Sequence, residues 1–224
     1  THGIDPNLVD ERAQNVVRSL HQAGYQAYIV GGAVRDLLVG LRPKDFDVAT
    51  NATPEQVKGL FRRAFIIGRR FRIVHVVFGR GREHEVIEVS TFRAYLDNAA
   101  AEQVAGNERT SKSELAGMQH AVDSSGRVLR DNVWGPQDED ATRRDFTINA
   151  MYYDPQTQVV VDYHHGIKDV KNRVIRMIGD SATRYREDPV RIIRAVRFAA
   201  KLSGLGFTLD AKTRAPLVKS QQLL

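Results

Sequence analysis

The stretch Lys44-Asp45-Phe46-Asp47-Val48-Ala49-Thr50 decides the fold that the sequence predicts. In an extended segment successive side chains point to opposite faces, so Asp45 and Asp47 share one face while Phe46 points into a core. Two neighbouring carboxylates repel each other unless a cation lies between them. Their oxygens suit Mg²⁺, which usually takes one or two carboxylates and completes its shell with water and substrate phosphates. A solvated strand edge has the same pattern, so the dyad alone leaves both interpretations open.

A glycine pair precedes the dyad, between the apolar run 28–30 and a short helical pattern that ends at Gly40. Glycine lets backbone N–H groups approach a ligand closely, and a helix N-terminus favours anions. Gly31 and Gly32 are therefore candidates for a phosphate-binding turn. Taken alone, the pair is better explained as a plain tight turn, because the sequence is neither G-x-G-x-x-G nor a Walker loop.

Composition restricts the class of protein. The chain has 224 residues, 42% of them hydrophobic, which is enough for one large domain or one and a half smaller ones. The absence of cysteine excludes disulfides, thiolate metal sites and cysteine nucleophiles. No apolar run approaches the roughly 20 residues of a membrane span, and we expect a cytoplasmic monomer. The chain starts at Thr1 without methionine and stops within a helical pattern, so we expect a fragment of a longer protein.

Charge indicates the kind of partner. The formal net charge is +6 and the isoelectric point is about 9.7, which suits a polyanion. Arginine outnumbers lysine, and its planar fork binds phosphates and base edges in bidentate fashion.

Hydrophobic periodicity predicts an α+β fold. Besides the short helix that ends at Gly40, helices are expected from Asp5-Pro6 to Gly24, after the capping box that begins at Thr53, and after Gly179. The segment 94–141 has no sustained period and is predicted to be a long, mobile loop. The predicted strands are 26–30, 44–50, 65–67, 73–78, 85–91, 159–162 and 174–178.

The strand 85–91 offers a third acidic ligand. Glu88 lies on one face of this strand and Glu85 on the other, and either could complete a metal site with the dyad. We favour Glu88, with Glu85 as the competing choice. A charge on an edge strand that discourages aggregation explains Glu88 equally well.

The predicted helix after Gly179 carries two features. Asp180 or Ser181 can cap it, and an apolar stripe follows at Val190, Ile193, Val196 and Ala200. Asp188 and Arg191 are three residues apart and would offer an acceptor and a donor fork to a nucleobase. A helix cap at Asp188, or a surface ion pair between the two, is the alternative.

Three motifs resemble those of the class II nucleotidyltransferases of the DNA polymerase beta superfamily, which contains tRNA CCA-adding enzymes and bacterial poly(A) polymerases. The first is Gly31-Gly32-Ala33-Val34-Arg35-Asp36 followed by Lys44-Asp45-Phe46-Asp47. The second, at 143–151, is similar to R-R-D-F-T-I-N, and the third, at 187–194, is similar to the neck-helix motif E-D-x-x-R-x-x-R. The resemblance implies a nucleotidyltransferase head with a mixed or antiparallel sheet and flanking helices at 1–178. It also implies the start of an all-helical neck and body at 179–224.

The resemblance also assigns roles to individual residues. Asp45, Asp47 and Glu88 would hold two Mg²⁺ ions and carry the catalytic step. The remaining implied contacts are to ATP: Gly31, Gly32 and Arg35 at the triphosphate, Arg144, Asp145 and Asn149 at the ribose and phosphates, Asp188 and Arg191 at the base, and Arg194 behind this pair or at a phosphate.

The implied activity is template-independent polyadenylation, in which AMP passes from ATP to an RNA 3′-hydroxyl with release of pyrophosphate. Phe71-Arg72 stands where CCA-adding enzymes typically have Gly-Thr, which favours the poly(A) polymerase branch. A tRNA nucleotidyltransferase that adds CCA or A is the alternative. A non-catalytic RNA-binding protein of the same fold is the alternative from another class. Such a protein would be expected to lack the two aspartates, and both Asp45 and Asp47 are present.

Overall fold

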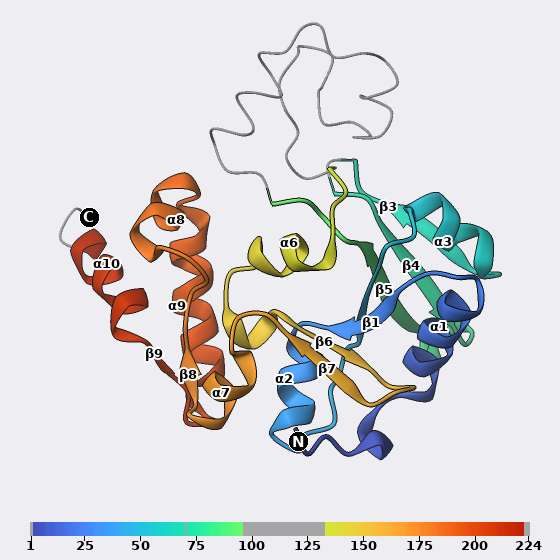
Figure 1. Cartoon of the computed structure of the whole chain (residues 1–224), viewed down its shortest axis with the longest axis horizontal. Helices are drawn as coiled ribbons and strands as arrows, with labels where there is room; N and C mark the ends of the chain where they lie inside the picture. The colour runs from blue at the N-terminus through green and yellow to red at the C-terminus, as the bar shows by residue number, and fades with distance from the viewer. Residues whose placement is uncertain (1, 70, 96–132, 222–224) are drawn as a thin grey trace, which may run out of the picture.

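The computed structural model describes residues 2–69, 71–95 and 133–221, and its centre is a seven-stranded mixed sheet (Figure 1). The strand order is β3-β4-β5-β2-β1-β6-β7, and the β2–β5 pair is parallel whereas the other neighbours are antiparallel. The expected α+β class is therefore confirmed. The strands are β1 Ala27–Val30, β2 Asp47–Thr50, β3 Ala64–Ile67, β4 Ile73–Phe78, β5 Glu85–Thr91, β6 Met151–Asp154 and β7 Val159–Asp162.

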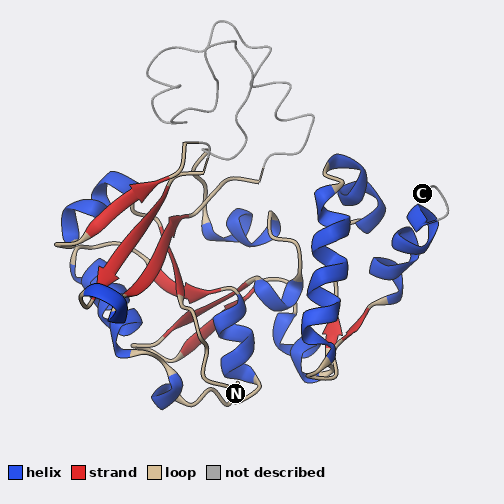
Figure 2. Cartoon of the chain, turned by 180° about the vertical axis from the view of Figure 1, so that it is seen from behind, coloured by secondary structure: helices blue, strands red, loops and turns tan. Residues whose placement is uncertain are grey.

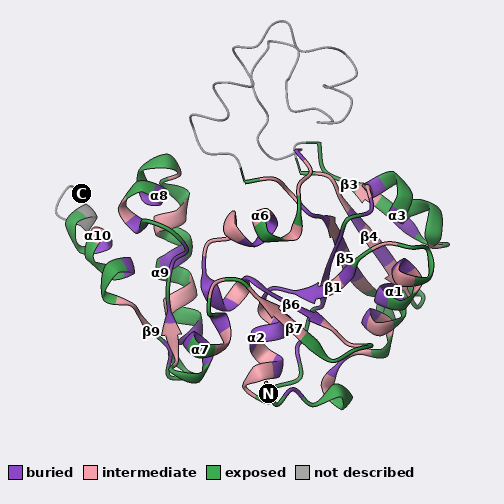
Figure 3. Ribbon diagram, in the orientation of Figure 1, coloured by how far each residue is buried: buried purple, intermediate pink, exposed green. Residues whose placement is uncertain are grey.

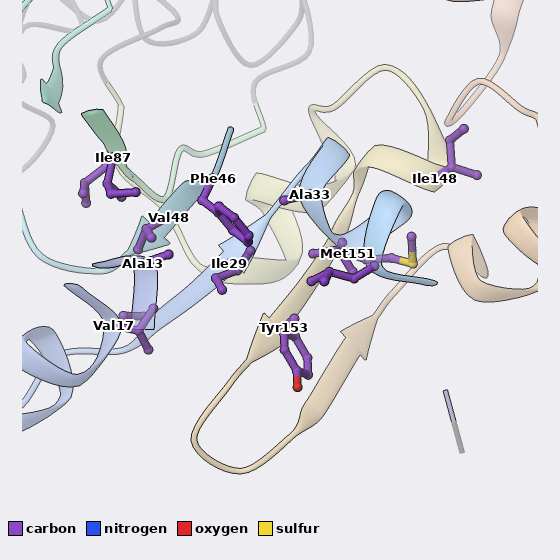
Figure 4. Packing of buried hydrophobic residues seen from close by; sticks show 14 of the residues in the cluster. Ala13, Val17, Ile29, Ala33, Phe46, Val48, Ile87, Ile148, Met151 and Tyr153 are labelled. Atoms are coloured by element: carbon purple, nitrogen blue, oxygen red, sulfur yellow. The ribbon is translucent and has the colours of Figure 1, made fainter. Parts of the chain in front are cut away.

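Two helices cover one face of the sheet. They are α1 (Glu11–Gln22), which packs on β1, β2 and β5, and α3 (Pro54–Leu60), which packs on β3, β4 and β5. The predicted capping box of α3 is present, with the Thr53 hydroxyl accepting from Gln56 N and the Gln56 side chain accepting from Thr53 N. In the core between these layers, Ile29, Val48 and Ile87 lie near the helical residues Ala13 and Val17 (Figure 4).

The opposite face of the sheet holds a second, smaller core. Val30, Ala49, Phe92 and Tyr152 pack there with Ala141 of α6 (Gln137–Thr142). Since side chains alternate along a strand, the side chain at the first position of β2 points to this second face. That geometry directs the acidic residues away from α1 and α3 and toward α6.

The chain after the sheet is mainly helical and lies beside the sheet, not upon it (Figures 1 and 2). A two-stranded parallel sheet joins β8 to β9 across the predicted domain boundary at 178. The remaining elements are α2 Gly32–Leu38, α7 Gly166–Lys171, β8 Val174–Ile175, α8 Ser181–Glu187, α9 Val190–Ser203, β9 Thr208–Leu209, α10 Ala211–Gln221 and the 3₁₀ turns η1 Pro6–Leu8, η2 Gly81–Glu83 and η4 Thr147–Asn149.

The first helix and the predicted loop differ from expectation. Asp5 caps only the 3₁₀ turn η1, and the long helix α1 begins at Glu11 because Asp10 accepts from Arg12 N at 2.8 Å. Within the predicted loop 94–141, residues 96–132 lie outside the described residues, whereas 133–141 contain a strand-like bridge and most of helix α6. Among the described residues no helix is long and apolar enough to cross a membrane.

Helix α9 exposes the apolar stripe that its sequence pattern marks. Val190, Ile193 and Val196 of that stripe are 57%, 53% and 51% exposed. The helix packs through another face, on which Ala195 and Leu202 are fully or almost fully buried. Figure 3 shows buried and exposed segments alternating along α9. Both stripes are apolar at helical spacing, so periodicity alone could not choose between them.

Candidate active site

Two carboxylates meet across the parallel pair of strands. Asp47 of β2 is in register with Glu88 of β5, and both are half-buried on the face of the sheet that α1 and α3 leave open. Glu85 is exposed at the far end of β5, where its register partner is Phe78 of β4. Of the two glutamates left open by the sequence, Glu88 is therefore the one that lies beside the dyad. Asp45 lies just before β2 and is exposed.

This proximity has an electrostatic cost. Burial, followed by the charge of Glu88 and a hydrogen bond with it, raises the pKa of Asp47 to about 7. The negative charge of Asp45 acts in the same direction, while the guanidinium of Arg144 opposes the shift. Asp47 resists ionisation because it is partly buried and two acids lie near it. A bound cation would stabilise its charged form.

The acidic residues suit a magnesium ion whose coordination shell is completed by the substrate. Among the described residues, no three His, Cys, Asp or Glu side chains lie together so that they could hold a metal ion by themselves. Mg²⁺ does not need such a cage, because it usually binds one or two carboxylates and takes its other ligands from water and phosphates. The hard oxygens of Asp47 and Glu88, in register on adjacent strands, match that requirement.

The glycine turn and Arg35 lie at the start of α2. Gly31 has a φ of +75°, a conformation that favours glycine. A Cβ on Gly32 would stand 3.1 Å from the Arg35 guanidinium, so the missing side chain makes room for that arginine. Arg35 is buried; it donates to Asn149 Oδ1 at 2.9 Å and its guanidinium lies 5.4 Å from the ring centre of Phe198. The arginine thus joins α2, η4 and α9.

A pocket of about 620 Å³ lies between the sheet and α9. Several of the expected nucleotide-binding residues line it, namely Arg144, Asp145, Asn149, Asp188, Arg191 and Arg194. The glycines, Arg35 and the three acids are not in its wall, but Arg144 connects the two regions because its charge acts on Asp47. Phe71, Arg143 and Phe146, which the sequence noted only as parts of motifs, line it too. The sequence did not single out the further wall residues Arg93, Tyr95, Phe198 and Lys201.

One acid of the pocket joins the sheet domain to α9. Asp145 lies 3.1 Å from Arg191 Nε and 3.4 Å from an Arg194 nitrogen. The ion pair between Asp188 and Arg191, which the sequence left open as an alternative to base binding, is not formed, because Arg191 turns to Asp145 and to Glu187 at 3.6 Å. Asp188 instead accepts from the backbone N–H of Val190 at 3.1 Å and from Arg194 at 3.1 Å.

Arg184 supports the pocket from α8. It is buried and donates to the main-chain oxygen of Arg144 at 2.6 Å and to that of Thr142. Its guanidinium also lies 5.8 Å from the ring centre of Tyr95. Only its place in an arginine-rich stretch of sequence hinted at a role, because the carbonyls that it reaches are about 40 positions away.

Comparison with known proteins places this architecture in a family. Residues 27–176 match the family described as the poly A polymerase head domain. Poly(A) polymerase I of Escherichia coli O157:H7 is 48% identical over 223 residues, covering 100% of this chain and 43% of the relative. Poly(A) polymerase I of Haemophilus influenzae is 50% identical over 200 residues, covering 89% of this chain and 40% of the relative.

CCA-adding enzymes are similar as well. That of Lactobacillus helveticus is 36% identical over 213 residues, covering 95% of this chain and 45% of the relative. The crystal structure of the Bacillus stearothermophilus CCA-adding enzyme in complex with CTP has a TM-score of 0.69 at 32% identity, covering 94% of this chain and 43% of that one. The chain thus spans less than half the length of these relatives. The family match over most of the chain shows that it belongs to the poly A polymerase head-domain family of class II nucleotidyltransferases.

Proposed function

We propose that the protein to which this chain belongs adds AMP from ATP to the 3′-hydroxyl of RNA and releases pyrophosphate. The single observation that carries the proposal is the pairing of Asp47 with Glu88 beside a pocket lined by arginines. Identities of 48–50% to proteins named poly(A) polymerase I support adenylate as the transferred group. A monomeric state and a cytoplasmic location stay predictions.

The acidic residues would hold the metal. Asp45, Asp47 and Glu88 are the residues that would bind two Mg²⁺ ions. When bound, Mg²⁺ lowers the pKa of the attacking hydroxyl and neutralises the charge of the triphosphate and its leaving pyrophosphate. The carboxylates orient the two reacting groups, and no covalent enzyme intermediate is required.

The arginines would bind the triphosphate. Arg144 is the strongest candidate, because its Nε is buried without a hydrogen-bond partner among the described residues and a phosphate oxygen would satisfy it. Gly31 and Gly32 would admit the phosphates close to the backbone. Arg35 would act through Asn149, which it holds by a hydrogen bond, because its own guanidinium is buried.

The base would lie toward α9. Arg191 lines the pocket, and Asp145 lies 3.1 Å from its buried Nε without hydrogen-bond geometry, so the guanidinium is not saturated by this acid. Asp188, just before α9, and Arg194, within α9, lie on either side of Arg191 in the sequence. A site with buried polar groups rejects a base that leaves them unpaired, which is how such residues would select adenine.

Addition of CCA to tRNA is the second candidate, favoured by the likeness to a CTP-bound CCA-adding enzyme. Phe71 in the pocket wall argues against it, because CCA-adding enzymes typically have glycine there.

The deciding experiment uses the full-length protein with Mg²⁺, offering ATP or CTP to a short RNA and to a tRNA that lacks its 3′ end. We expect long adenylate tails on the RNA with ATP and little addition with CTP. Addition of two cytidylates and one adenylate to the tRNA would support the second candidate instead. The matched control is Asp47→Asn, which should extend neither substrate.

A further inference from the structure

Asp140 is a buried acid that the proposed mechanism does not use. It lies in α6, is 0% exposed, and does not line the pocket. Its carboxylate accepts from the Tyr152 hydroxyl at 2.5 Å and from the backbone N–H of Arg93 at 2.9 Å. Arg143 Nε at 3.2 Å and an Arg144 nitrogen at 3.3 Å complete its shell.

The partners of Asp140 hold it in the charged form. Burial by itself would raise its pKa, but the charges of Arg143 and Arg144 and the two hydrogen bonds from Tyr152 and the Arg93 amide outweigh it, so the pKa is lowered. A buried charge is tolerated only where such partners surround it, and removing the charge leaves the partners uncompensated.

These partners come from three separate segments of the chain. Arg93 follows β5, Arg143 and Arg144 follow α6, and Tyr152 belongs to β6. The three arginines line the pocket, whereas Asp140 lies behind them. Arg144 is also the cation whose charge reaches Asp47. One carboxylate therefore fixes two adjacent guanidiniums that would otherwise repel each other and turn toward other acids.

We propose that Asp140 is a positioning residue that fixes Arg143 and Arg144 in the orientation that binds the triphosphate of ATP. This inference rests on the proposed function, since it assumes that the pocket takes a nucleoside triphosphate. It does not depend on which nucleotide is added or on which RNA is extended.

The test is calorimetric binding of ATP, inorganic triphosphate and adenosine to the full-length protein in Mg²⁺ buffer, with and without Asp140→Asn. The amide keeps the shape but removes the charge and places an NH₂ group against donors. We expect affinity for ATP and for inorganic triphosphate to fall about tenfold or more, as for the loss of charge-assisted hydrogen bonds. Affinity for adenosine should stay within about twofold of the parent.

Asp169→Asn is the matched control. Asp169 is also a buried carboxylate, 3% exposed, that accepts from the Thr147 hydroxyl at 2.6 Å and from Arg176 at 3.2 Å, and it does not line the pocket. This variant should lose thermal stability but bind triphosphate as the parent does. Equal weakening in both variants would reduce Asp140 to a structural residue. Triphosphate affinity within twofold of the parent in Asp140→Asn would overturn the proposal.

A milder variant covers the case in which Asp140→Asn does not fold. Tyr152→Phe removes one donor to Asp140 and keeps the ring. It should weaken triphosphate binding by about two- to fivefold, and an unchanged affinity would contradict the proposal. The readout also separates the two hypotheses. If the parent binds triphosphate but does not extend RNA, the proposed function fails while the role of Asp140 stands.

Discussion

At the scale of single residues, substitution of Asp47 should affect stability and nucleotide addition in opposite directions. Asp47→Asn removes a carboxylate from a repelling group, so the free energy of unfolding without Mg²⁺ should hold or rise. Nucleotide addition should fall about 100-fold or more, because metal binding supplies several kcal/mol to the transition state. Thermal melts and extension kinetics on the full-length protein measure the two effects.

The control for Asp47 lies on the neighbouring strand. Glu85→Gln changes an exposed acid of β5 and should leave extension at the parent's rate, whereas Glu88→Gln should behave like Asp47→Asn. Extension close to normal in Asp47→Asn or Glu88→Gln would remove the basis for a metal site on these strands.

Asp140 gives a prediction about pH. Its folded pKa lies below the value of about 3.9 that an unfolded aspartate has. A depressed folded pKa contributes stability that is present above the unfolded value and is lost as the pH falls through the folded value. The gap in unfolding free energy between parent and Asp140→Asn should therefore be constant near pH 7 and shrink below about pH 4. Urea unfolding at pH 3, 4, 5 and 7 is the measurement, and a gap that widens in acid would contradict the assignment.

Strand alternation was enough to nominate Asp45, Asp47 and Glu88 from sequence. It could not show that Glu88, not Glu85, is in register with Asp47, because register depends on pairing between distant strands. The surroundings of Arg35 were equally out of reach, since its partner Asn149 is 114 positions away.

At the scale of elements, α9 provides a direct comparison of its two apolar stripes. Leu202→Ala removes a side chain that is 2% exposed and should cost about 2–5 kcal/mol of unfolding free energy. Ile193→Ala, on the apolar stripe that faces solvent and is itself 53% exposed, should change it by less than about 0.5 kcal/mol. Chemical unfolding of this chain measures both changes. The reverse order of effects would show that α9 packs through the stripe of Ile193 instead.

Element ends were predictable where a local signal existed. The capping box at Thr53 and the cap at Asp180 are present because each uses neighbours within three residues. Helix α6 was missed because its six residues, Gln137–Thr142, carry four polar or acidic side chains before a single buried alanine. Its place is set by tertiary contacts of Asp140 and Ala141, which no window of local sequence contains.

At the scale of the whole molecule, the pocket exists only while α9 stays packed against the segment around Asp145 and Phe146. Phe146 and Phe198 stack with ring centres 4.9 Å apart, and Asp145 bridges to Arg191 with both side chains less than one-fifth exposed. The sequence predicted a head followed by a helical neck but not the contacts that join them. Those contacts connect residues some 50 positions apart, and they form in place of the Asp188–Arg191 ion pair that the spacing left open.

A double-mutant cycle measures how strongly the two parts are coupled. Asp145→Ala, Arg191→Ala and the double variant should give an interaction energy of about 0.5–3 kcal/mol in unfolding, as expected for a partly buried pair. The control is the more exposed Asp10–Arg12 pair at the start of α1, at 2.9 Å, which should give about 0.2–1 kcal/mol. Because the Asp145–Arg191 bridge spans two parts of the chain, its removal should also broaden the unfolding transition, whereas loss of the control pair should not. Equal interaction energies and equally sharp transitions for both pairs would show that the pocket is held by the stacked rings and not by the ion pair.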